Sequence, residues 1–213
     1  MTLPTSGLIT INDRGARAAT TFGSVAAGGG NMVFIKKLTA SSSGTLSFVD
    51  GASSVVLDST YKEYMFTFKN IHAATDEAHL TFNMSVDGGS NYNVTKTSTS
   101  FQAYHRENDE ANPAVAYSTS HDLAQGTGFQ NFIMGLGTDA DQNGCGSLHL
   151  FNPSSTTFVK HFISVISNTE ANDYATQYNT AGYGNTTSAV DAVQFKMSSG
   201  NIDAGDICLY GIL

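Results

Sequence analysis

The sequence contains no tryptophan, only two cysteines and three prolines among 213 residues, and only 13% of its residues are charged. Two cysteines are too few for the disulfide framework of a small secreted domain. Cys145 and Cys208 are therefore expected to be free thiols, with a single bridge as the alternative. The absence of tryptophan weakens the case for an aromatic platform that stacks on sugars, although the nine tyrosines can take that place.

Positive charge is also scarce. Ten lysines and arginines stand against eighteen aspartates and glutamates, which gives a formal net charge of −8. A protein that binds nucleic acid needs a basic face for the phosphates, and here the basic residues are scattered along the chain. We therefore do not expect nucleic acid as a partner.

Long apolar runs are missing as well. No stretch approaches the about 20 apolar residues that a membrane helix requires. The first residues lack the basic region and the continuous apolar run of a secretory signal. We therefore expect no membrane insertion, and a protein that works outside a cell would leave it by a route other than a cleaved signal.

The familiar catalytic motifs are absent from the sequence. It contains no G-x-S-x-G, P-loop or G-x-G-x-x-G motif, and its six histidines lack metal-ligand spacing such as H-x-x-x-H. Glu107, Asp109 and Glu110 form one acidic cluster, but a single polar loop would solvate them alike and would not separate an acid from a base. We predict no catalytic residue, no metal ligand and no cofactor, and we do not expect an enzyme.

One segment matches half of a calcium-binding loop. Asp139, Asp141, Asn143 and Gly144 follow the pattern D-x-D-x-N-G, which places oxygens at alternate positions before a sharp bend. The twelfth position, which should supply a bidentate glutamate, is Leu150. A polar hairpin turn is the prediction, with a calcium site as the alternative.

What the sequence does contain is apolar alternation with a period of two. In residues 64–68 the aromatic side chains Tyr64, Phe66 and Phe68 alternate with Met65 and Thr67. Residues 80–86 show the same alternation, with apolar side chains at 80, 82, 84 and 86 and mostly polar ones between them. Successive side chains of a strand point to opposite faces, so both segments are predicted strands with one buried face. The polar connection between them suits a long hairpin or a crossing between two sheets.

Several more short segments with turn signals every ten or so residues complete the pattern. It predicts an all-β fold, an antiparallel β-sandwich with jelly-roll-like topology. Residues 158–166 are apolar at both alternations, which indicates a central strand or a face against another subunit. Residues 174–183 are rich in tyrosine, and the glycines at 182 and 184 favour a loop or an irregular edge.

Residues 1–31 differ from the rest and are predicted to be an extended N-terminal arm with a glycine-rich linker, followed by the β-sandwich domain at residues 32–213. The arm holds a short apolar patch and two of the three arginines, and Gly28-Gly-Gly30 follows as a flexible joint. So short a segment cannot bury a core of its own, so we expect it to attach to another protein; the alternative is an arm folded back onto its own domain. The predicted attachment residues are Leu3, Leu8, Ile9, Ile11, Arg14 and Arg17.

Two stretches resemble a known class of proteins. The opening Leu3-Pro-Thr-Ser-Gly-Leu-Ile9 resembles the start of many virion proteins of tailed bacteriophages. The ending from Val193 to Ile212 is similar to the closing hairpin of a β-sandwich module in tail-fibre-like and other surface proteins of marine and cyanobacterial phages. The resemblance touches most of residues 32–213 and the arm.

This resemblance implies a structural, often homotrimeric virion component, assembled in the host cytoplasm and displayed on the particle. Its role would be adhesion at a tail or fibre, or decoration of a capsid, with other virion proteins and a host surface glycan as candidate partners. A receptor-binding role predicts exposed loops rich in tyrosine, and the candidates are Tyr104, Tyr117, Tyr174, Tyr178 and Tyr183. The alternatives are a free carbohydrate-binding β-sandwich module and, with less support, a hydrolase or lyase.

Overall fold

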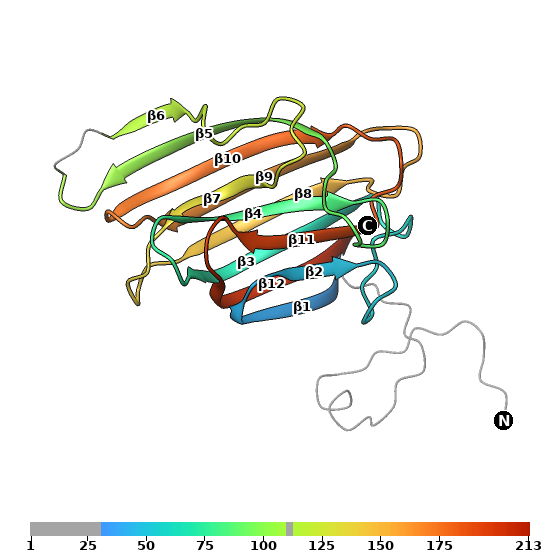
Figure 1. Cartoon of the computed structure of the whole chain (residues 1–213), viewed down its shortest axis with the longest axis horizontal. Helices are drawn as coiled ribbons and strands as arrows, with labels where there is room; N and C mark the ends of the chain where they lie inside the picture. The colour runs from blue at the N-terminus through green and yellow to red at the C-terminus, as the bar shows by residue number, and fades with distance from the viewer. Residues whose placement is uncertain (1–30, 110–112) are drawn as a thin grey trace, which may run out of the picture. The chain divides into compact units, whose positions relative to one another are not determined.

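The computed structural model describes residues 31–109 and 113–213. These residues form two antiparallel sheets and contain no helix (Figure 1), which confirms the predicted all-β sandwich. The predicted arm, with Leu3, Leu8, Ile9, Ile11, Arg14 and Arg17, lies outside the described residues. Its role in attachment therefore stays a prediction.

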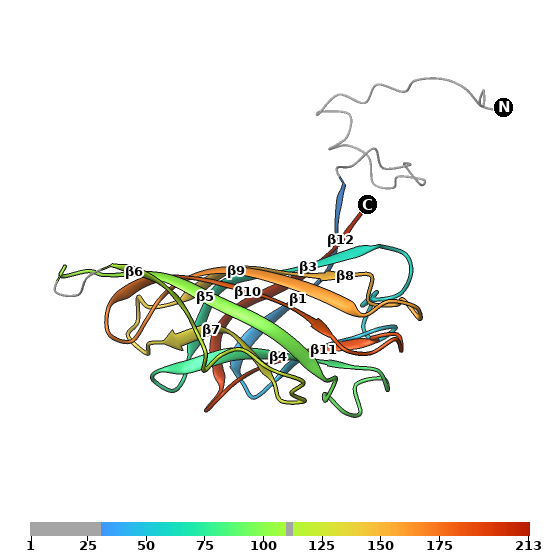
Figure 2. The same ribbon diagram turned by 90° about the horizontal axis from the view of Figure 1, so that it is seen from above.

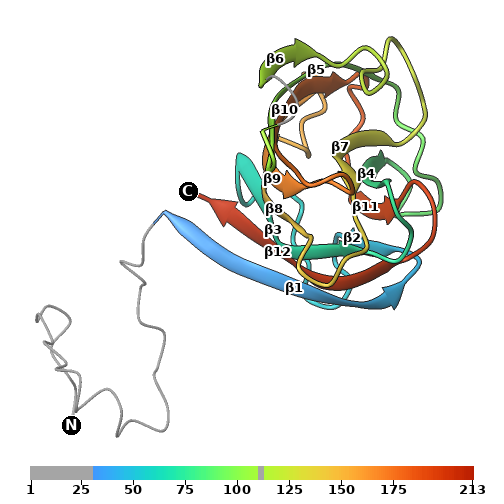
Figure 3. The same ribbon diagram turned by 90° about the vertical axis from the view of Figure 1, so that its left-hand side faces the viewer.

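The two sheets differ in size. The larger has eight strands, in the spatial order β1 (Met32–Ser43), β12 (Ile202–Ile212), β3 (Glu63–Ala73), β8 (Gly144–Phe151), β9 (Lys160–Thr169), β10 (Tyr174–Gly184), β5 (Lys96–Arg106) and β6 (Ala114–Tyr117). The smaller has four, in the order β2 (Leu46–Val49), β11 (Ala192–Met197), β4 (Ala78–Ser85) and β7 (Gln130–Leu136). Figure 3 shows the smaller sheet packed against one face of the larger.

The strand order is that of a jelly roll with two insertions. Without the pairs β5–β6 and β9–β10, the sheets read β1-β12-β3-β8 and β2-β11-β4-β7, which is the order produced by two interleaved Greek keys. The inserted pairs extend the larger sheet on one side only. Consecutive strands β3 and β4 lie in different sheets, so the connection between them is a crossing and not a hairpin.

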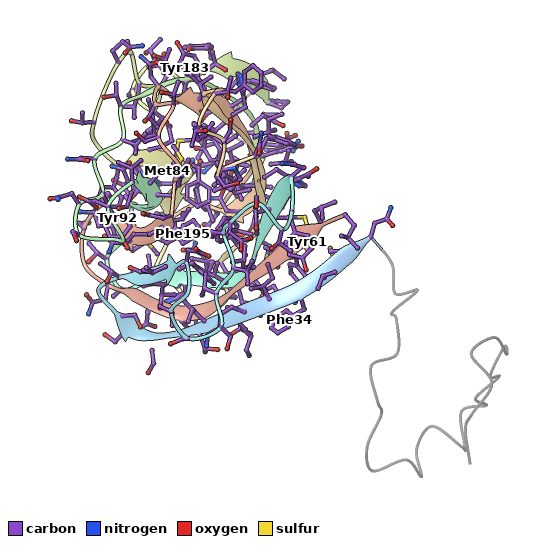
Figure 4. All side chains as sticks on the ribbon, turned by 90° about the vertical axis from the view of Figure 1, so that its right-hand side faces the viewer. Phe34, Tyr61, Met84, Tyr92, Tyr183 and Phe195 are labelled. Atoms are coloured by element: carbon purple, nitrogen blue, oxygen red, sulfur yellow. The ribbon has the colours of Figure 1, made fainter. Side chains whose placement is uncertain are left out.

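The core lies between the sheets and is built around phenylalanine rings. Tyr64, Phe66 and Phe68 of β3 and Phe82 of β4 are buried, as their alternation predicts. Phe195 of β11 lies between the two sheets (Figure 4). Its ring is 5.2 Å from that of Phe66 and 5.3 Å from that of Phe68, both edge to face. Edge-to-face pairs add stabilisation beyond the burial of area.

The prediction of a loop at residues 174–183 is wrong, because β10 occupies them in full and pairs with β9 and β5. The glycines that suggested a loop serve close packing. A Cβ at Gly182 would lie 2.5 Å from the carbonyl oxygen of Thr97 and 2.7 Å from the ring of Phe162. The strand therefore keeps glycine where its neighbours leave no room for a side chain.

Two lysines are fully buried, which the sequence pattern did not indicate. The Lys96 amine donates to Asn83 Oδ1 at 2.5 Å and to the Val94 carbonyl at 2.7 Å. The Lys160 amine donates to three backbone carbonyls, including that of Ser155 at 2.6 Å. Burial lowers the pKa of Lys96 to about 7 and also lowers the pKa of Lys160.

Both cysteines are free thiols, with Cys208 buried and Cys145 partly exposed, as expected from their number. The predicted polar turn at residues 139–144 is present, because the Gln142 N–H donates to the Asp139 carbonyl at 2.9 Å. It is not a hairpin, however, since it connects β7 and β8, which lie in different sheets. In the described ranges no helix is long and apolar enough to span a bilayer.

Candidate functional site

From β9 to β6, the outward strand positions of the larger sheet carry no charged residue, although two loop aspartates reach its rim, where Asp122 accepts from the Tyr117 hydroxyl at 2.6 Å and Asp109 pairs with His105 at 2.9 Å. By the register of the strands, its outward positions are alternate residues from His161 to Ser167 in β9, from Ala175 to Tyr183 in β10 and from Thr97 to His105 in β5, with Val115 and Tyr117 in β6. None of these is Asp, Glu, Lys or Arg. We call this surface the uncharged face.

Apolar side chains stand exposed on the uncharged face. Ile163 and Val165 of β9 are 48% and 44% exposed, and Phe101 of β5 is 47% exposed. Two shallow hollows lie among them, one of about 390 Å³ between His161 and Tyr183 and one of about 520 Å³ beside Val115. Exposed apolar patches of this kind mark interaction sites on soluble proteins.

The other half of the same outer surface is different. There Lys37 of β1 pairs with Asp206 of β12 at 3.2 Å, and Glu63 of β3 pairs with His149 of β8 at 2.5 Å. The N-terminal end of β1 and the C-terminal end of β12 extend past the rest of the sheet on its outer side (Figures 2 and 3). Phe34 on this ribbon is 56% exposed.

A second surface lies on the inner side of the larger sheet. The C-terminal end of β5 and the N-terminal end of β10 extend beyond β4 and β7 (Figures 1 and 2). The smaller sheet therefore leaves the inner face of these two strand ends uncovered. Two adjoining cavities of about 420 and 250 Å³ open there, and Gln102 and Glu170 line both. We call this surface the tyrosine groove.

Aromatic rings form one end of the tyrosine groove. The rings of Tyr104 in β5 and Tyr174 in β10 are 5.9 Å apart and close to perpendicular. The Arg106 guanidinium lies 5.6 Å from the centre of the Tyr174 ring, within the range of a cation–π contact. Both tyrosines are partly exposed and line the smaller cavity, so the parts of their rings that these contacts leave open are available to a ligand.

A carboxylate lies in the middle of the groove. The Tyr178 hydroxyl donates to Glu170 Oε1 at 2.5 Å, and the Glu170 side chain packs over Gly135, where an added Cβ would be 3.4 Å away. Burial raises the pKa of Glu170, and burial with the carboxylate partner raises the pKa of Tyr178. One carboxylate accepts several hydrogen bonds, so Glu170 keeps capacity for a ligand.

Two histidines form the other end. The rings of His79 and His121 are 5.0 Å apart and nearly perpendicular, and burial lowers the pKa of both. The Gly135 backbone N–H donates to His79 Nδ1 at 2.8 Å, which makes Nε2 the protonated nitrogen of the neutral ring. His121 Nδ1 and the Ser118 hydroxyl share a hydrogen bond of 2.6 Å.

The predicted receptor-facing tyrosines do not lie in loops. Tyr104, Tyr174 and Tyr178 lie on β5 and β10 and come together at the tyrosine groove, whereas Tyr117 and Tyr183 lie on the uncharged face. Tyr178 is only 4% exposed, so its ring cannot form a broad contact with a receptor. That any of these residues meets a receptor stays a prediction.

Four polar residues of the groove were not indicated by the sequence pattern: Gln102, Glu170, His79 and His121. One signal was present for Gln102, because it shares the alternation of Tyr104 in β5. The others come from different strands and turns, and only the fold brings them together.

In the described ranges, no group of three or more His, Cys, Asp or Glu side chains is placed to hold a metal ion. What the groove offers is an aromatic surface beside amide, carboxylate and imidazole groups, which suits a polar ligand with an apolar face. Comparison of the chain with protein-family models, with curated proteins and with solved structures finds no match.

Proposed function

We propose that this chain is a structural component of a tailed-phage virion, displayed on the particle surface as a homo-oligomer. The observation that carries the proposal is the uncharged face, because it gives an acidic protein one surface that a second copy can approach. The resemblance of the two ends of the chain to phage virion proteins supplies the setting, a place on the tail, on a fibre or on the capsid, and makes a trimer the expected state.

Charge favours a second copy as the occupant of the uncharged face. The chain has a formal net charge of −8, so copies repel each other over most of their surface. On the uncharged face this repulsion is weakest. Burial of the exposed Ile163, Val165 and Phe101 against a second copy would add a favourable hydrophobic contribution to the free energy of association. Closed symmetry would let the same patch be buried in each copy.

The size of the face is also adequate. Its three long strands have ten or eleven residues each. With about 3.3 Å per residue and about 4.8 Å between strands, they and β6 span on the order of 600 Å² in projection. A stable interface buries about 800 Å² of accessible surface per partner, and side chains raise the accessible area above the projected one. The uncharged face can therefore account for most of such an interface.

The fold is compatible with this role. Jelly rolls occur in viral capsid proteins and in lectin domains, although a fold alone does not define a function. Attachment to the particle is assigned to the segment before β1, on the sequence pattern of Leu3, Leu8, Ile9, Ile11, Arg14 and Arg17. Deletion of residues 1–30 should abolish incorporation into particles and leave the melting temperature of the sandwich unchanged.

Oligomer formation tests the observation that carries the proposal. Light scattering of the full chain should give an oligomer, and Val165→Asp should give a folded monomer because it places a charge in the interface. Phe158→Asp is the matched control, since Phe158 is 68% exposed and lies outside the uncharged face. A monomeric parent protein, or an unchanged mass for Val165→Asp, contradicts the assignment.

Particle location tests the phage assignment separately. Antibodies raised against residues 31–213 should decorate intact phage particles in negative-stain electron micrographs. A free carbohydrate-binding module is the second candidate, and the tyrosine groove is the feature that favours it. A protein found only outside particles, but active in sugar binding, would support that second candidate.

A further inference from the structure

We infer that the tyrosine groove is a binding site for a neutral carbohydrate, whose ring stacks on Tyr104 and Tyr174 and whose hydroxyl groups bond to Gln102 and Glu170. The inference deepens the proposed function, since it names what a displayed protein of this kind would bind. It rests on the shape and chemistry of the groove and on no property of a virion.

The groove has the dimensions of a small-molecule site. Its two adjoining cavities of about 420 and 250 Å³ share Gln102 and Glu170, and protein sites for small molecules measure about 300–1,000 Å³. It is formed where β5 and β10 extend beyond the smaller sheet (Figures 1 and 2). Strands on either side therefore hold its walls, and a ligand can enter without moving the core.

The aromatic end matches the C–H face of a sugar ring. Tyr104 and Tyr174 lie on adjacent strands, and each ring is partly exposed. Tyrosine offers a large, rigid apolar surface with a polar tip, which suits a ligand with an apolar face and a polar rim. The near-perpendicular arrangement of the two rings makes a corner in which one sugar ring can be held on two sides.

The polar groups match sugar hydroxyls, which both donate and accept. The Gln102 side-chain amide, on the groove wall, has no hydrogen-bond partner among the residues that the structure describes, so it offers an acceptor and two donors. Glu170 accepts a hydrogen bond from Tyr178, and a carboxylate has capacity for several. His79 contributes an N–H donor at Nε2, because its Nδ1 is occupied by the Gly135 N–H.

The charge of the groove selects the class of sugar. Glu77 and Glu170 both line it, and Arg106 places a positive charge at the tyrosine end, 5.6 Å from the centre of the Tyr174 ring. Burial lowers the pKa of His79 and His121 and so keeps these rings neutral near pH 7. Two carboxylates against one guanidinium disfavour the carboxylate of a uronic or sialic acid. The site therefore prefers an uncharged hexose or N-acetylhexosamine.

Saturation-transfer difference NMR on the full chain tests the site, with methyl glucoside, methyl galactoside, methyl mannoside and N-acetylglucosamine as probes and N-acetylneuraminic acid as the acidic comparison. At least one neutral probe should give a transfer signal at tens of millimolar, and the acidic sugar should give a weaker one. Tyr104→Ala and Gln102→Ala should each weaken binding about tenfold or more, as expected for loss of a stacking surface or a hydrogen-bonding group. Phe158→Ala removes an exposed aromatic ring elsewhere and should leave binding unchanged.

Three outcomes overturn the inference: no signal with any neutral probe, stronger binding of the acidic sugar, or binding that both groove variants leave intact. Glu170→Gln tests the role of charge, because it keeps the acceptor for Tyr178 and removes only the negative charge that disfavours the acidic sugar. Failure here is distinct from failure of the proposed function, since particle location and oligomeric state are measured without any sugar.

Discussion

Replacement of Lys96 by methionine should change how the stability of the protein depends on pH. Lys96 is fully buried at the start of β5, and its hydrogen-bond partners are the uncharged Asn83 Oδ1 and the Val94 carbonyl. Burial lowers its pKa from 10.5 to about 7. Between these two values the unfolded chain holds a proton on this amine that the folded chain has lost.

The sign of the effect follows from that difference. Because the unfolded state binds more protons between pH 7 and about 10.5, stability rises with pH across this window. One pH unit corresponds to at most about 1.4 kcal/mol for one group, so from pH 7 to pH 9 the contribution of Lys96 is on the order of 2 kcal/mol. Below pH 7 the Lys96 amine is protonated in both states. The destabilisation caused by burying its charge is then at its largest and no longer changes with pH.

Lys96→Met removes the titrating group and keeps a side chain of similar length. Asn83 Oδ1 still accepts a hydrogen bond from the Met84 N–H at 2.8 Å, so only the Val94 carbonyl loses this donor. That loss costs about 1–3 kcal/mol at every pH and does not affect the slope. The slope, and not the absolute stability, is therefore the decisive quantity.

The assay is urea unfolding followed by circular dichroism at pH 7, 8 and 9, for the parent protein, Lys96→Met and the exposed control Lys62→Met. The gap between the parent and Lys96→Met should change by about 1–2 kcal/mol over this range, in the direction that favours the parent at high pH. Lys62→Met should run parallel to the parent. Three parallel curves would refute the argument.

Three further predictions concern the core, the groove and one glycine. Phe82→Ala should lower the free energy of unfolding by about 3–5 kcal/mol, whereas Phe158→Ala should change it little, and similar effects on thermal melting would contradict the core assignment. Because burial lowers the pKa of His79, the unfolded state binds more protons below pH 6.5 and stability should fall as the pH drops; an imidazole that titrates at its ordinary value by NMR would disprove this. Gly146→Ala should destabilise the protein by more than about 1 kcal/mol, because φ is +154° and the added Cβ would lie 2.3 Å from the Val165 carbonyl oxygen. Gly128→Ala is the control, since an added Cβ there meets no atom within 4 Å. Equal melting temperatures of the two variants would refute the reasoning.

Much of the fold could be predicted from local alternation. The period of two in β3 identified its inward side chains, since burial on one face selects every second residue. In β4 the apolar residues from Leu80 to Met84 are buried as predicted, but the polar residues that alternate with them are buried too, so the expected single buried face is wrong for that strand. Residues 158–166 were expected to be a central strand or to face another subunit because both alternations are apolar; β9 begins only at Lys160 but does lie between β8 and β10. Their outward alternation, with Ile163 and Val165, is the part that stays exposed in the single chain.

Other features could not be predicted, because they depend on which strands become neighbours. Gly182 suggested a loop, and only the presence of Thr97 and Phe162 on adjacent strands explains a glycine inside β10. The tyrosine groove requires that β5 and β10 extend past the smaller sheet, which no local pattern reveals. Lys96 begins its strand like an ordinary exposed lysine, and its burial follows from the position of Asn83 on another sheet.

The pairing of the earliest strands with the latest has a consequence for how the protein is made. In the described part of the chain, β1 has β12 as its sheet neighbour and β2 has β11. After β1 and β2 have emerged from the ribosome, nearly all of the remaining sandwich must therefore be synthesised before either strand can pair with its partner. Until then the nascent chain exposes unpaired strand edges, which is the condition under which β proteins aggregate. We expect folding to begin within the later strands and to finish only when β12 has left the exit tunnel and inserts between β1 and β3.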